Sequence, residues 1–391
     1  MEDSNRVLIV TSIALFLSVL VWFNYSAVLP FVVEEWDLSS TEAGIIFAAF
    51  QAGYLVAIVP AGWLADQYSP RWVIAVGSVG TAIPSLAFAG VADDVVVGTI
   101  LRFVSGMFIA GVYVPGMRFI SGRYSESKRG RALGIYIGSF ELSSGLSFVF
   151  ATVAAEAVNW RLAIAATSFG ALFVAPLILG FTRDNPDRKS SDTVIFDKTL
   201  FLNRDFLAAV SAYSWHNWEL FGVRNWLLPF LITSTAFAAV ESAIAPGLVV
   251  GGTIIMGGFG NIAGGWLSDR IGRLRTIAAG LGGGIVLSAI FGMLGSLPFI
   301  ILVLATLCYG FIISLDSAPT STLVTEVVAD DHIGKALSIQ SLAGFSTTVV
   351  SPIVFGFALD RSGYALAFPT LAAGALLGLL SVTALAWRRH D

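Results

Sequence analysis

Six ionisable residues lie inside long apolar stretches of the sequence, where a charge is costly. They are Arg102, Glu141, His216, Glu219, Arg224 and Asp316. On insertion scales such a residue costs about 2.5–3.5 kcal/mol at the centre of a bilayer, so it needs a partner, water or a function. A carboxyl group in a poorly hydrated cavity disfavours its charged form and can bind and release a proton. An arginine at the same depth can bind a negatively charged group of a small molecule.

The densest polar run of the chain lies at 214–225 and contains His216, Asn217, Glu219 and Arg224. At about 100° per residue in a helix, three of these side chains share an arc of about 100°, and Glu219 lies about 60° to its side. We predict that this helix face binds the cargo and faces a central cavity. The alternative is that Glu219 forms a structural ion pair with an arginine.

Two further carboxyl groups, Glu141 and Asp316, are each accompanied by serines or threonines. Together with Glu219 they are our candidates for the group that carries a proton. The alternative is a carboxylate that is permanently paired with Arg102 or Arg224, which would have a structural role.

Composition requires a membrane around these residues. Of 391 residues, 56% are hydrophobic and only 12% are charged, with a mean hydropathy of +0.82, whereas soluble domains carry about 25% charged residues. The net charge of −4 excludes a basic nucleic-acid interface. A single cysteine excludes an intramolecular disulfide, and the three histidines are scattered along the chain. We therefore expect no metal, no cofactor and no catalytic constellation, so the protein should not be an enzyme.

Apolar stretches of about 20 residues are long enough to span the bilayer, and we predict twelve such helices. Their ranges are 7–33, 42–65, 72–91, 95–121, 130–155, 160–182, 205–233, 242–268, 274–294, 298–324, 334–359 and 364–387. The polar stretch 184–204 divides them into an amino-terminal bundle (1–183) and a carboxy-terminal bundle (205–391). The prediction is an all-α membrane protein.

Lysines and arginines gather in alternate loops, while acidic residues gather in the others. Because basic residues mark cytoplasmic loops, both termini should be cytoplasmic. We expect a multi-pass protein of the plasma (inner) membrane.

The two halves of the sequence resemble each other at an offset near 203 residues. The segment 62–66 recurs at 265–269, and Gly106 corresponds to Gly310. A parallel repeat of this kind predicts two six-helix bundles related by a pseudo-twofold axis, with a cavity between them. It also pairs the polar run at 214–225 with the helix of Asn24 and Tyr25, which we add to the candidate binding residues.

The repeated segment carries a specific motif, G-x-L-x-D-R/K-x-G-R/K. The first copy matches at Gly62, Leu64, Asp66 and Arg71, and departs at Gln67 and Ser69. The second copy matches at Gly265, Leu267, Asp269, Arg270, Gly272 and Arg273. With these two copies, the chain resembles transporters of the major facilitator superfamily (MFS) over essentially its whole length.

The resemblance implies that this motif is a latch, which ties the halves together when the cavity opens outward. Asp66 would face the start of the helix at 334–359, and Asp269 would face the start of the helix at 130–155. The predicted gating latch comprises Gly62, Asp66, Arg71, Gly265, Asp269, Arg270 and Arg273. The alternative is an ordinary interfacial loop with positive charges on the cytoplasmic side.

Arg102, Gly106 and Ala110 also resemble a fourth-helix motif, R-x-x-x-G-x-x-x-A, that the superfamily associates with proton coupling. The alternative is an arginine that extends to water near the end of its helix. The resemblance implies a secondary active transporter working by alternating access. We favour symport of a small polar or anionic metabolite with protons, by a monomer in the bilayer.

Two alternatives remain open, namely proton-coupled efflux of drugs or amphipathic metabolites and a non-transporting membrane sensor on the same fold. Efflux is disfavoured because Ser139 replaces the proline of the antiporter pattern G-x-x-x-G-P. The segment 258–263 matches a dinucleotide fingerprint, but no strand precedes it. We interpret Gly260 and Gly264 as a contact between helices.

Overall fold

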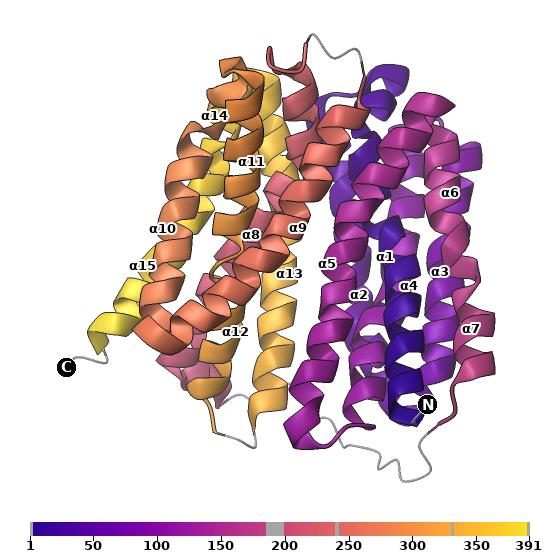
Figure 1. The fold of residues 1–391 in the computed structure, drawn as a ribbon, viewed down its shortest axis with the longest axis vertical. Helices are drawn as coiled ribbons and strands as arrows, with labels where there is room; N and C mark the ends of the chain where they lie inside the picture. The colour runs from indigo at the N-terminus through magenta and orange to yellow at the C-terminus, as the bar shows by residue number, and fades with distance from the viewer. Residues whose placement is uncertain (1–2, 185–198, 239–241, 330–331, 389–391) are drawn as a thin grey trace. The chain divides into compact units, whose positions relative to one another are not determined.

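The computed structural model of the chain describes residues 3–184, 199–238, 242–329 and 332–388, and within these ranges it contains helices and no strand (Figure 1). The first six spans are α1 (Asp3–Trp36), α2 (Ser40–Gln67), α3 (Pro70–Val91), α4 (Val95–Ser121), α5 (Glu126–Ala157) and the pair α6 (Trp160–Leu172) and α7 (Val174–Phe181). The next six are α8 (Arg204–Thr233), α9 (Ile244–Ile271), α10 (Arg273–Phe291), the pair α11 (Phe299–Ile313) and α12 (Ser317–Glu326), α13 (Ile333–Ser362), and the pair α14 (Tyr364–Ala367) and α15 (Pro369–Arg388).

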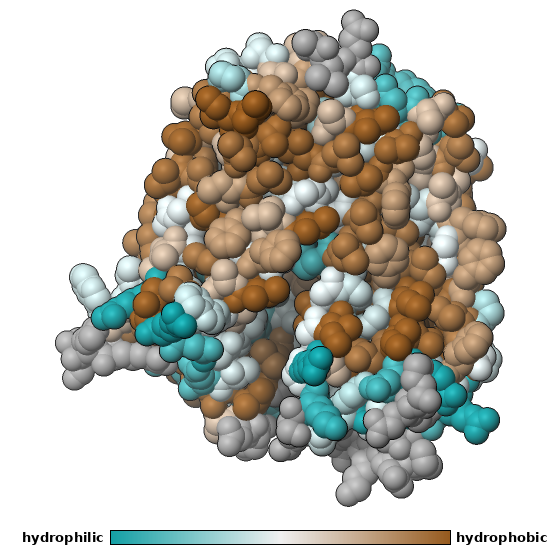
Figure 2. All heavy atoms as spheres, in the orientation of Figure 1, coloured by the Kyte–Doolittle hydropathy of each residue, from teal (hydrophilic) through white to brown (hydrophobic). Residues whose placement is uncertain are grey.

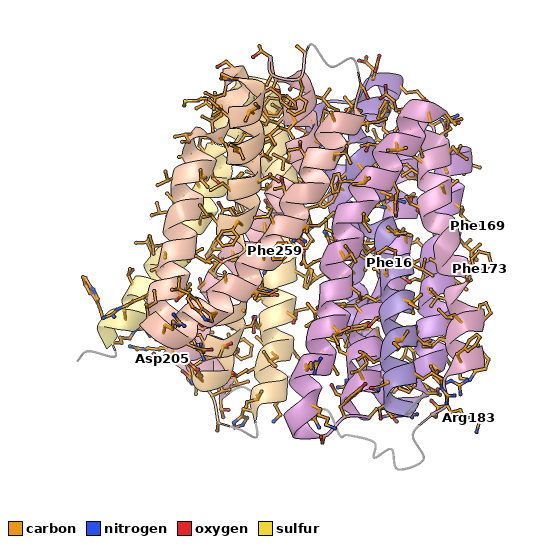
Figure 3. The ribbon with its side chains drawn as sticks, in the orientation of Figure 1. Phe16, Phe169, Phe173, Arg183, Asp205 and Phe259 are labelled. Carbon is orange, nitrogen blue, oxygen red and sulfur yellow. The ribbon has the colours of Figure 1, made fainter. Side chains whose placement is uncertain are left out.

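Among the described residues, eleven helical segments are long and apolar enough to cross a membrane. The predicted span that is absent from these eleven is α8, which carries the polar run at its centre. Hydrophobic side chains cover the middle of the helices, and hydrophilic ones gather near helix ends (Figure 2). Phe169 and Phe173, each 54% exposed, project outward from their helix (Figure 3), as lipid-facing residues do.

The chain packs into two compact units. Unit 1 comprises residues 1–38, 49–193 and 242–251, and unit 2 comprises residues 39–48, 194–241 and 252–391. The first turns of α2 therefore belong to unit 2, and the first turns of α9 belong to unit 1. Most of the predicted linker, 185–198, lies outside the described residues.

Polar side chains set the starts of several helices. Asp94 accepts hydrogen bonds from the backbone at the start of α4, Asn159 does so for α6, and Asn203 does so for α8. Each supplies an acceptor to amides that have no partner within the first turn of a helix.

Glycines allow the closest helix contacts, and they do so at corresponding places in the repeat. A Cβ on Gly106 of α4 would lie 2.0 Å from the carbonyl oxygen of Phe50, and one on Gly310 of α11 would lie 2.2 Å from that of Thr253. A Cβ on Gly260 of α9 would lie 2.1 Å from the carbonyl oxygen of Phe311 in α11, and one on Gly264 would lie 1.8 Å from that of Leu315, just after α11. The dinucleotide-like segment is thus part of a helix contact, as the sequence indicated.

Gly264→Ala is expected to destabilise the protein by about 1–3 kcal/mol, the usual cost of overpacking. The new methyl carbon would lie 1.8 Å from the carbonyl oxygen of Leu315. The matched control is Gly265→Ala, whose methyl carbon would lie at an ordinary 3.8 Å from Ala318. Thermal unfolding in detergent should show a lower midpoint for the first variant alone, and equal midpoints would contradict this contact.

Two acidic residues, Asp360 of α13 and Glu156 of α5, cap helix starts at corresponding repeat positions. Asp360 accepts hydrogen bonds from the amides of Ser40 and Thr41 at 2.7 and 2.9 Å, at the start of α2. Glu156 accepts one from the amide of Ala243 at 2.9 Å, just before α9. The favourable end of the helix dipole adds to each contact.

Asp360→Ala is expected to lower the free energy of unfolding by about 1 kcal/mol, the usual value of a cap. Glu156→Ala should cost less, because Glu156 accepts one amide hydrogen bond and Asp360 accepts two. Glu34, an exposed acid without a described partner, provides the control variant Glu34→Ala. Thermal unfolding in detergent measures all three, and the cap is refuted if Asp360→Ala and Glu34→Ala unfold alike.

Candidate functional site

Arg102 lies inside unit 1 with 1% of its surface exposed. Its Nη1 donates to the carbonyl oxygen of Val21 at 3.1 Å and to Oδ1 of Asn24 at 3.2 Å. Its Nη2 donates to the carbonyl oxygen of Trp22 at 3.1 Å, and the guanidinium lies 4.3 Å from the centre of the Phe50 ring. The arginine is therefore held by neutral groups of α1 and α2, and it does not extend to water.

Asn24 connects Arg102 to two other helices. Its amide nitrogen donates to Thr167 at 3.1 Å and to Ser168 at 3.3 Å on α6, and to Ser85 of α3 at 3.5 Å. The ring of Tyr25 lies 5.6 Å from the guanidinium. Asn24 and Tyr25 of α1 and the sequence-distant Arg102 of α4 thus form one buried cluster.

The positive charge of Arg102 is not neutralised by any carboxylate among the described residues, and its Nε has no hydrogen-bond partner there. Glu141, partly buried on α5, is not among the groups that contact Arg102. This excludes a permanent Glu141–Arg102 pair in this structure. A buried guanidinium with unused donor capacity can bind an anionic ligand.

In unit 2, His216 of α8 lies against the break between α11 and α12. Its Nδ1 is 2.9 Å from Oδ1 of Asp316, and its Nε2 is 2.8 Å from the hydroxyl oxygen of Ser317. The imidazole N–H is not aligned with the carboxylate, so the two groups are at ion-pair distance without a hydrogen bond. Asp316 is 1% exposed and has no arginine or lysine partner in the described residues.

Glu219 lies one turn further along α8. Ser288 of α10 donates to its Oε1 at 2.6 Å, and the hydroxyl of Tyr309 lies 2.5 Å from that of Ser288. Glu219 is 1% exposed. The predicted alternative, an ion pair of Glu219 with an arginine, is absent from the described contacts.

Two glycines of α10 make room for the two acids. A Cβ on Gly284 would lie 2.5 Å from Oε2 of Glu219, and one on Gly280 would lie 2.9 Å from Cβ of Asp316. Neither glycine is among the site residues predicted from the sequence, and the same holds for Ser288 and Tyr309. The spacing Gly280-x-x-x-Gly284-x-x-x-Ser288 places all three on one helix face and would have been the signal.

The polar residues of α8 have different contacts in the structure. His216 and Glu219 contact α10 and α12 within their own unit. Asn217 donates to the carbonyl oxygen of Tyr213 in the preceding turn at 2.9 Å, and Arg224, 5% exposed, lies 5.9 Å from the Phe221 ring. Because α8 is helical from Arg204 to Thr233, the angular spacing of these residues holds, and binding of cargo by this face stays a prediction.

The second copy of the motif is organised by Arg273. Its Nη1 donates to Asp269 at 2.5 Å and to Ser268 at 2.6 Å, and its Nε donates to Glu326 of α12 at 3.1 Å. A Cβ on Gly265 would lie at an ordinary 3.8 Å from Ala318 of α12. The second motif thus ties the α9–α10 loop to the end of α12.

Arg270 takes no part in these ion pairs. Its guanidinium lies 3.7 Å from the centre of the Trp266 ring. Asp269 belongs to unit 2 and α5 to unit 1. The predicted approach of Asp269 to the start of α5 therefore stays a prediction.

The first copy of the motif has different contacts. Arg71 donates to the carbonyl oxygen of Leu179 at 2.6 Å and lies 3.6 Å from Asp184. At the repeat offset Pro70, and not Arg71, corresponds to Arg273, so Arg71 lies one position too late to act as its counterpart.

The backbone of the two loops also differs. Gly272 has a φ of +93°, which favours glycine, whereas Ser69 has a φ of −61°. A Cβ on Gly62 would lie 3.9 Å from Val114, and the side chain of Asp66 lies outside the described part of the chain. Among the described residues, no group of three or more potential metal-ligating His, Cys, Asp or Glu side chains occurs.

The sequence profile of the Major Facilitator Superfamily matches residues 11–246 and 221–391. The chain is 28% identical to the probable sulfoacetate transporter SauU of Cupriavidus necator, over 93% of this chain and 88% of that protein. It is 22% identical to the glycerol-3-phosphate transporter of Bacillus subtilis, with the same coverage. A bacterial homologue of the human lysosomal transporter Spinster, solved in an inward-facing and occupied conformation, has the same fold, with a TM-score of 0.82, 15% identity and coverage of 100% and 97%.

These matches confirm the predicted fold of twelve membrane helices in two six-helix bundles. They also establish transport as the general function. The chain belongs to the Major Facilitator Superfamily and is a multi-pass membrane transporter.

Proposed function

We propose that this protein is a secondary active transporter that takes up a small anionic metabolite together with protons by alternating access. The observation that carries the proposal is the buried guanidinium of Arg102, held by neutral groups and without a carboxylate partner in the described residues. Such a charge favours an anionic ligand. The relatives support this cargo class, because they are named for sulfoacetate and glycerol 3-phosphate, which both carry negative charge.

The proton-carrying groups in this proposal are Glu219 and Asp316. Both are buried. Glu219 accepts a hydrogen bond from Ser288, Asp316 lies 2.9 Å from the imidazole of His216, and neither has an arginine or lysine partner among the described residues. An acid with a permanent cationic partner would stay ionised, whereas these two can change protonation state with their surroundings. Glu141, Asn217 and Arg224 remain candidates for contact with cargo.

We also propose that residues 1–183 and 205–391 form the two moving bundles, with both termini cytoplasmic and the monomer as the working unit. The repeated motif would act as the latch between conformations. Its second copy should be the stronger one, because Arg273 binds both Asp269 and Glu326, while the first copy has Pro70 at the corresponding position.

The test is the pH change outside proteoliposomes when cargo is added, with protein-free vesicles as the control. Glycerol 3-phosphate and sulfoacetate would be compared with the uncharged analogue glycerol and with lipophilic cations. Symport predicts that the external pH rises with at least one anion and stays constant with glycerol. A response confined to lipophilic cations would establish efflux instead, and binding of an anion without any flux would favour a sensor.

A further inference from the structure

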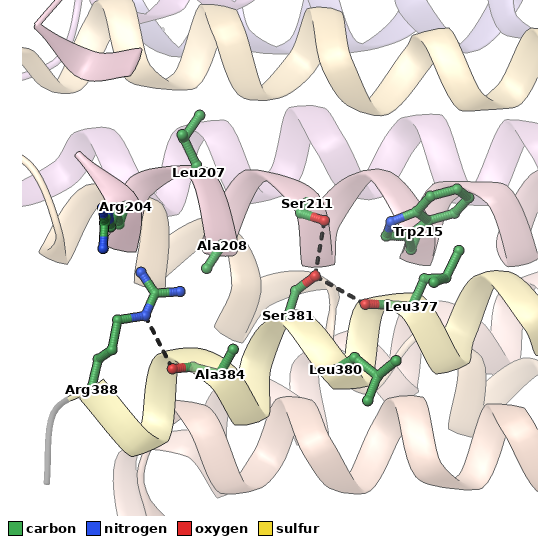
Figure 4. Close-up of a pocket in the computed structure, with 10 residues that line it drawn as sticks. All are labelled: Arg204, Leu207, Ala208, Ser211, Trp215, Leu377, Leu380, Ser381, Ala384 and Arg388. Atoms are coloured by element: carbon green, nitrogen blue, oxygen red, sulfur yellow. Dashed lines mark hydrogen bonds between the residues drawn. The ribbon is translucent and has the colours of Figure 1, made fainter. Parts of the chain in front are cut away.

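A groove of about 650 Å³ lies between α8 and α15 in unit 2 (Figure 4). The two helices run in opposite directions, so the start of α8 and the end of α15 meet at one end of the groove. Arg204 and Arg388 lie at this end. Leu207, Leu377 and Leu380 line the walls, and Trp215 lies with Leu377 at the end away from the arginines (Figure 4).

The mouth of the groove carries a net positive charge. Arg204 is exposed and has no ion-pair partner among the described residues. Arg388 donates from Nε to the carbonyl oxygen of Ala384 at 3.2 Å, and its Nη1 is 3.8 Å from Asp205, which Figure 3 labels in the first turn of α8. Of the two guanidinium groups, that of Arg388 has one carboxylate at 3.8 Å and that of Arg204 has none among the described residues. The planar donors of both suit a phosphate.

The walls of the groove suit hydrocarbon. Leu207, Leu377 and Leu380 are 40%, 43% and 55% exposed, which is favourable in lipid and not in water. The hydroxyls of Ser211 and Ser381 are 2.9 Å apart, and Ser381 also donates to the carbonyl oxygen of Leu377. Both hydroxyl groups are therefore hydrogen-bonded within the protein. An acyl chain that covers them leaves no hydrogen-bond donor without an acceptor.

The depth of the groove corresponds to one leaflet of a membrane. Eleven residues separate Arg204 from Trp215, and this is about 16 Å along a helix. The hydrocarbon core is about 30 Å thick, so a molecule with its charge at the arginines and its tail at Trp215 would span half of it. A soluble anion would use the arginines and leave the apolar walls unoccupied.

We propose that this groove binds one anionic phospholipid, with its phosphate between Arg204 and Arg388 and an acyl chain along Leu207, Leu377 and Leu380. In the proposed topology this lipid comes from the cytoplasmic leaflet, where basic pockets between membrane helices bind acidic head groups. A zwitterionic lipid fits the walls equally well, but its cationic group is repelled by the two arginines. The site is separate from the buried clusters around Arg102 and Glu219.

Native mass spectrometry of the detergent-solubilised protein tests this assignment. Phosphatidylglycerol and phosphatidylcholine with identical acyl chains are added separately, and each binding constant is measured. We expect phosphatidylglycerol to bind about tenfold more tightly or better, since each arginine near the membrane surface attracts an anionic lipid. Equal binding of the two lipids would overturn the proposal, and so would displacement of the lipid by inorganic phosphate at equal concentration, because that result indicates a soluble-anion site.

The variants separate charge from shape. The double variant Arg204→Ala/Arg388→Ala should lose the preference for phosphatidylglycerol, whereas Arg204→Lys/Arg388→Lys should keep most of it. Leu380→Trp, which fills the groove without changing its charge, should weaken both lipids. The control is Arg361→Ala, which removes an exposed arginine stacked on Phe357 of α13. Wild-type lipid preference in the double alanine variant, or unchanged binding in Leu380→Trp, would refute the site.

Discussion

Replacing Glu219 by glutamine is expected to abolish proton-driven accumulation of cargo while exchange of labelled cargo across the membrane continues. Glutamine has nearly the same shape and keeps an oxygen that accepts from Ser288, which donates at 2.6 Å in the wild type. It lacks the titratable proton. The initial rate of proton-coupled uptake should fall about 100-fold, in line with the loss of a positioned proton-transfer group, and a pH-sensitive dye inside proteoliposomes measures it.

Ser288→Ala is the matched control for Glu219→Gln. It removes the same hydrogen bond, 2.6 Å long, but leaves the acid in place. Coupling should therefore survive, with a changed dependence of the uptake rate on pH. Glu219 is excluded as the coupling group if Glu219→Gln accumulates cargo against its gradient at the wild-type level, and the same pair of assays on Asp316→Asn then identifies the alternative.

The fold could be predicted from the sequence because every helix that crosses a bilayer needs about 20 mostly apolar residues. Apolar length alone places each helix to within a few residues, and the repeat groups the helices into halves. The turn at 314–316, which separates α11 from α12, was not predicted. The apolar stretch from 298 to 324 continues through it, and hydropathy does not record where backbone hydrogen bonding changes.

The candidate site was predictable only in part. A charged residue within an apolar stretch is visible in the sequence, whereas the residues that contact it are not. Arg102, Asn24 and Tyr25 were identified by type and by repeat position, and the structure brings them together. Ser288 and Tyr309 were missed because serine and tyrosine are common in membrane helices. Their role depends on which neighbouring helix Glu219 faces, and helix packing decides this.

The two copies of the motif show that a pattern match can accept a residue that is out of register. A pattern match accepted Arg71 as part of the first latch, yet Arg71 is one residue out of register and binds the end of α7. A shift of one residue turns a helical side chain by about 100°. Spacing therefore has to be compared position by position before a function is carried from one copy of a repeat to the other.

Replacing Arg102 by alanine is expected to weaken binding of an anionic cargo about 100-fold and to leave binding of an uncharged analogue nearly unchanged. A charge-assisted bond contributes about 1.5–3 kcal/mol, and each 1.4 kcal/mol is tenfold in affinity. The affinity of Arg102→Lys for the anion should lie between those of the wild type and Arg102→Ala. Lysine keeps the charge, but it lacks the planar guanidinium that reaches Val21, Trp22 and Asn24 together. Isothermal titration of detergent-solubilised protein with glycerol 3-phosphate and glycerol measures both affinities.

Arg161→Ala provides the control for a general loss of positive charge from unit 1. Arg161 is a partly exposed arginine paired with the exposed acids Glu35 at 2.9 Å and Asp93 at 2.7 Å, and solvent-accessible pairs of this kind contribute little. Its loss should change neither affinity. If Arg102→Ala binds the anion as tightly as the wild type and unfolds at the same temperature, Arg102 is not the anion-binding residue. A second outcome supports the proposal: Arg102→Lys binds the anion more weakly than the wild type but unfolds at the same temperature. The weaker binding then reflects recognition of the cargo. Damage to the bundle would lower the unfolding temperature, because it would break the buried bonds of residue 102 to α1.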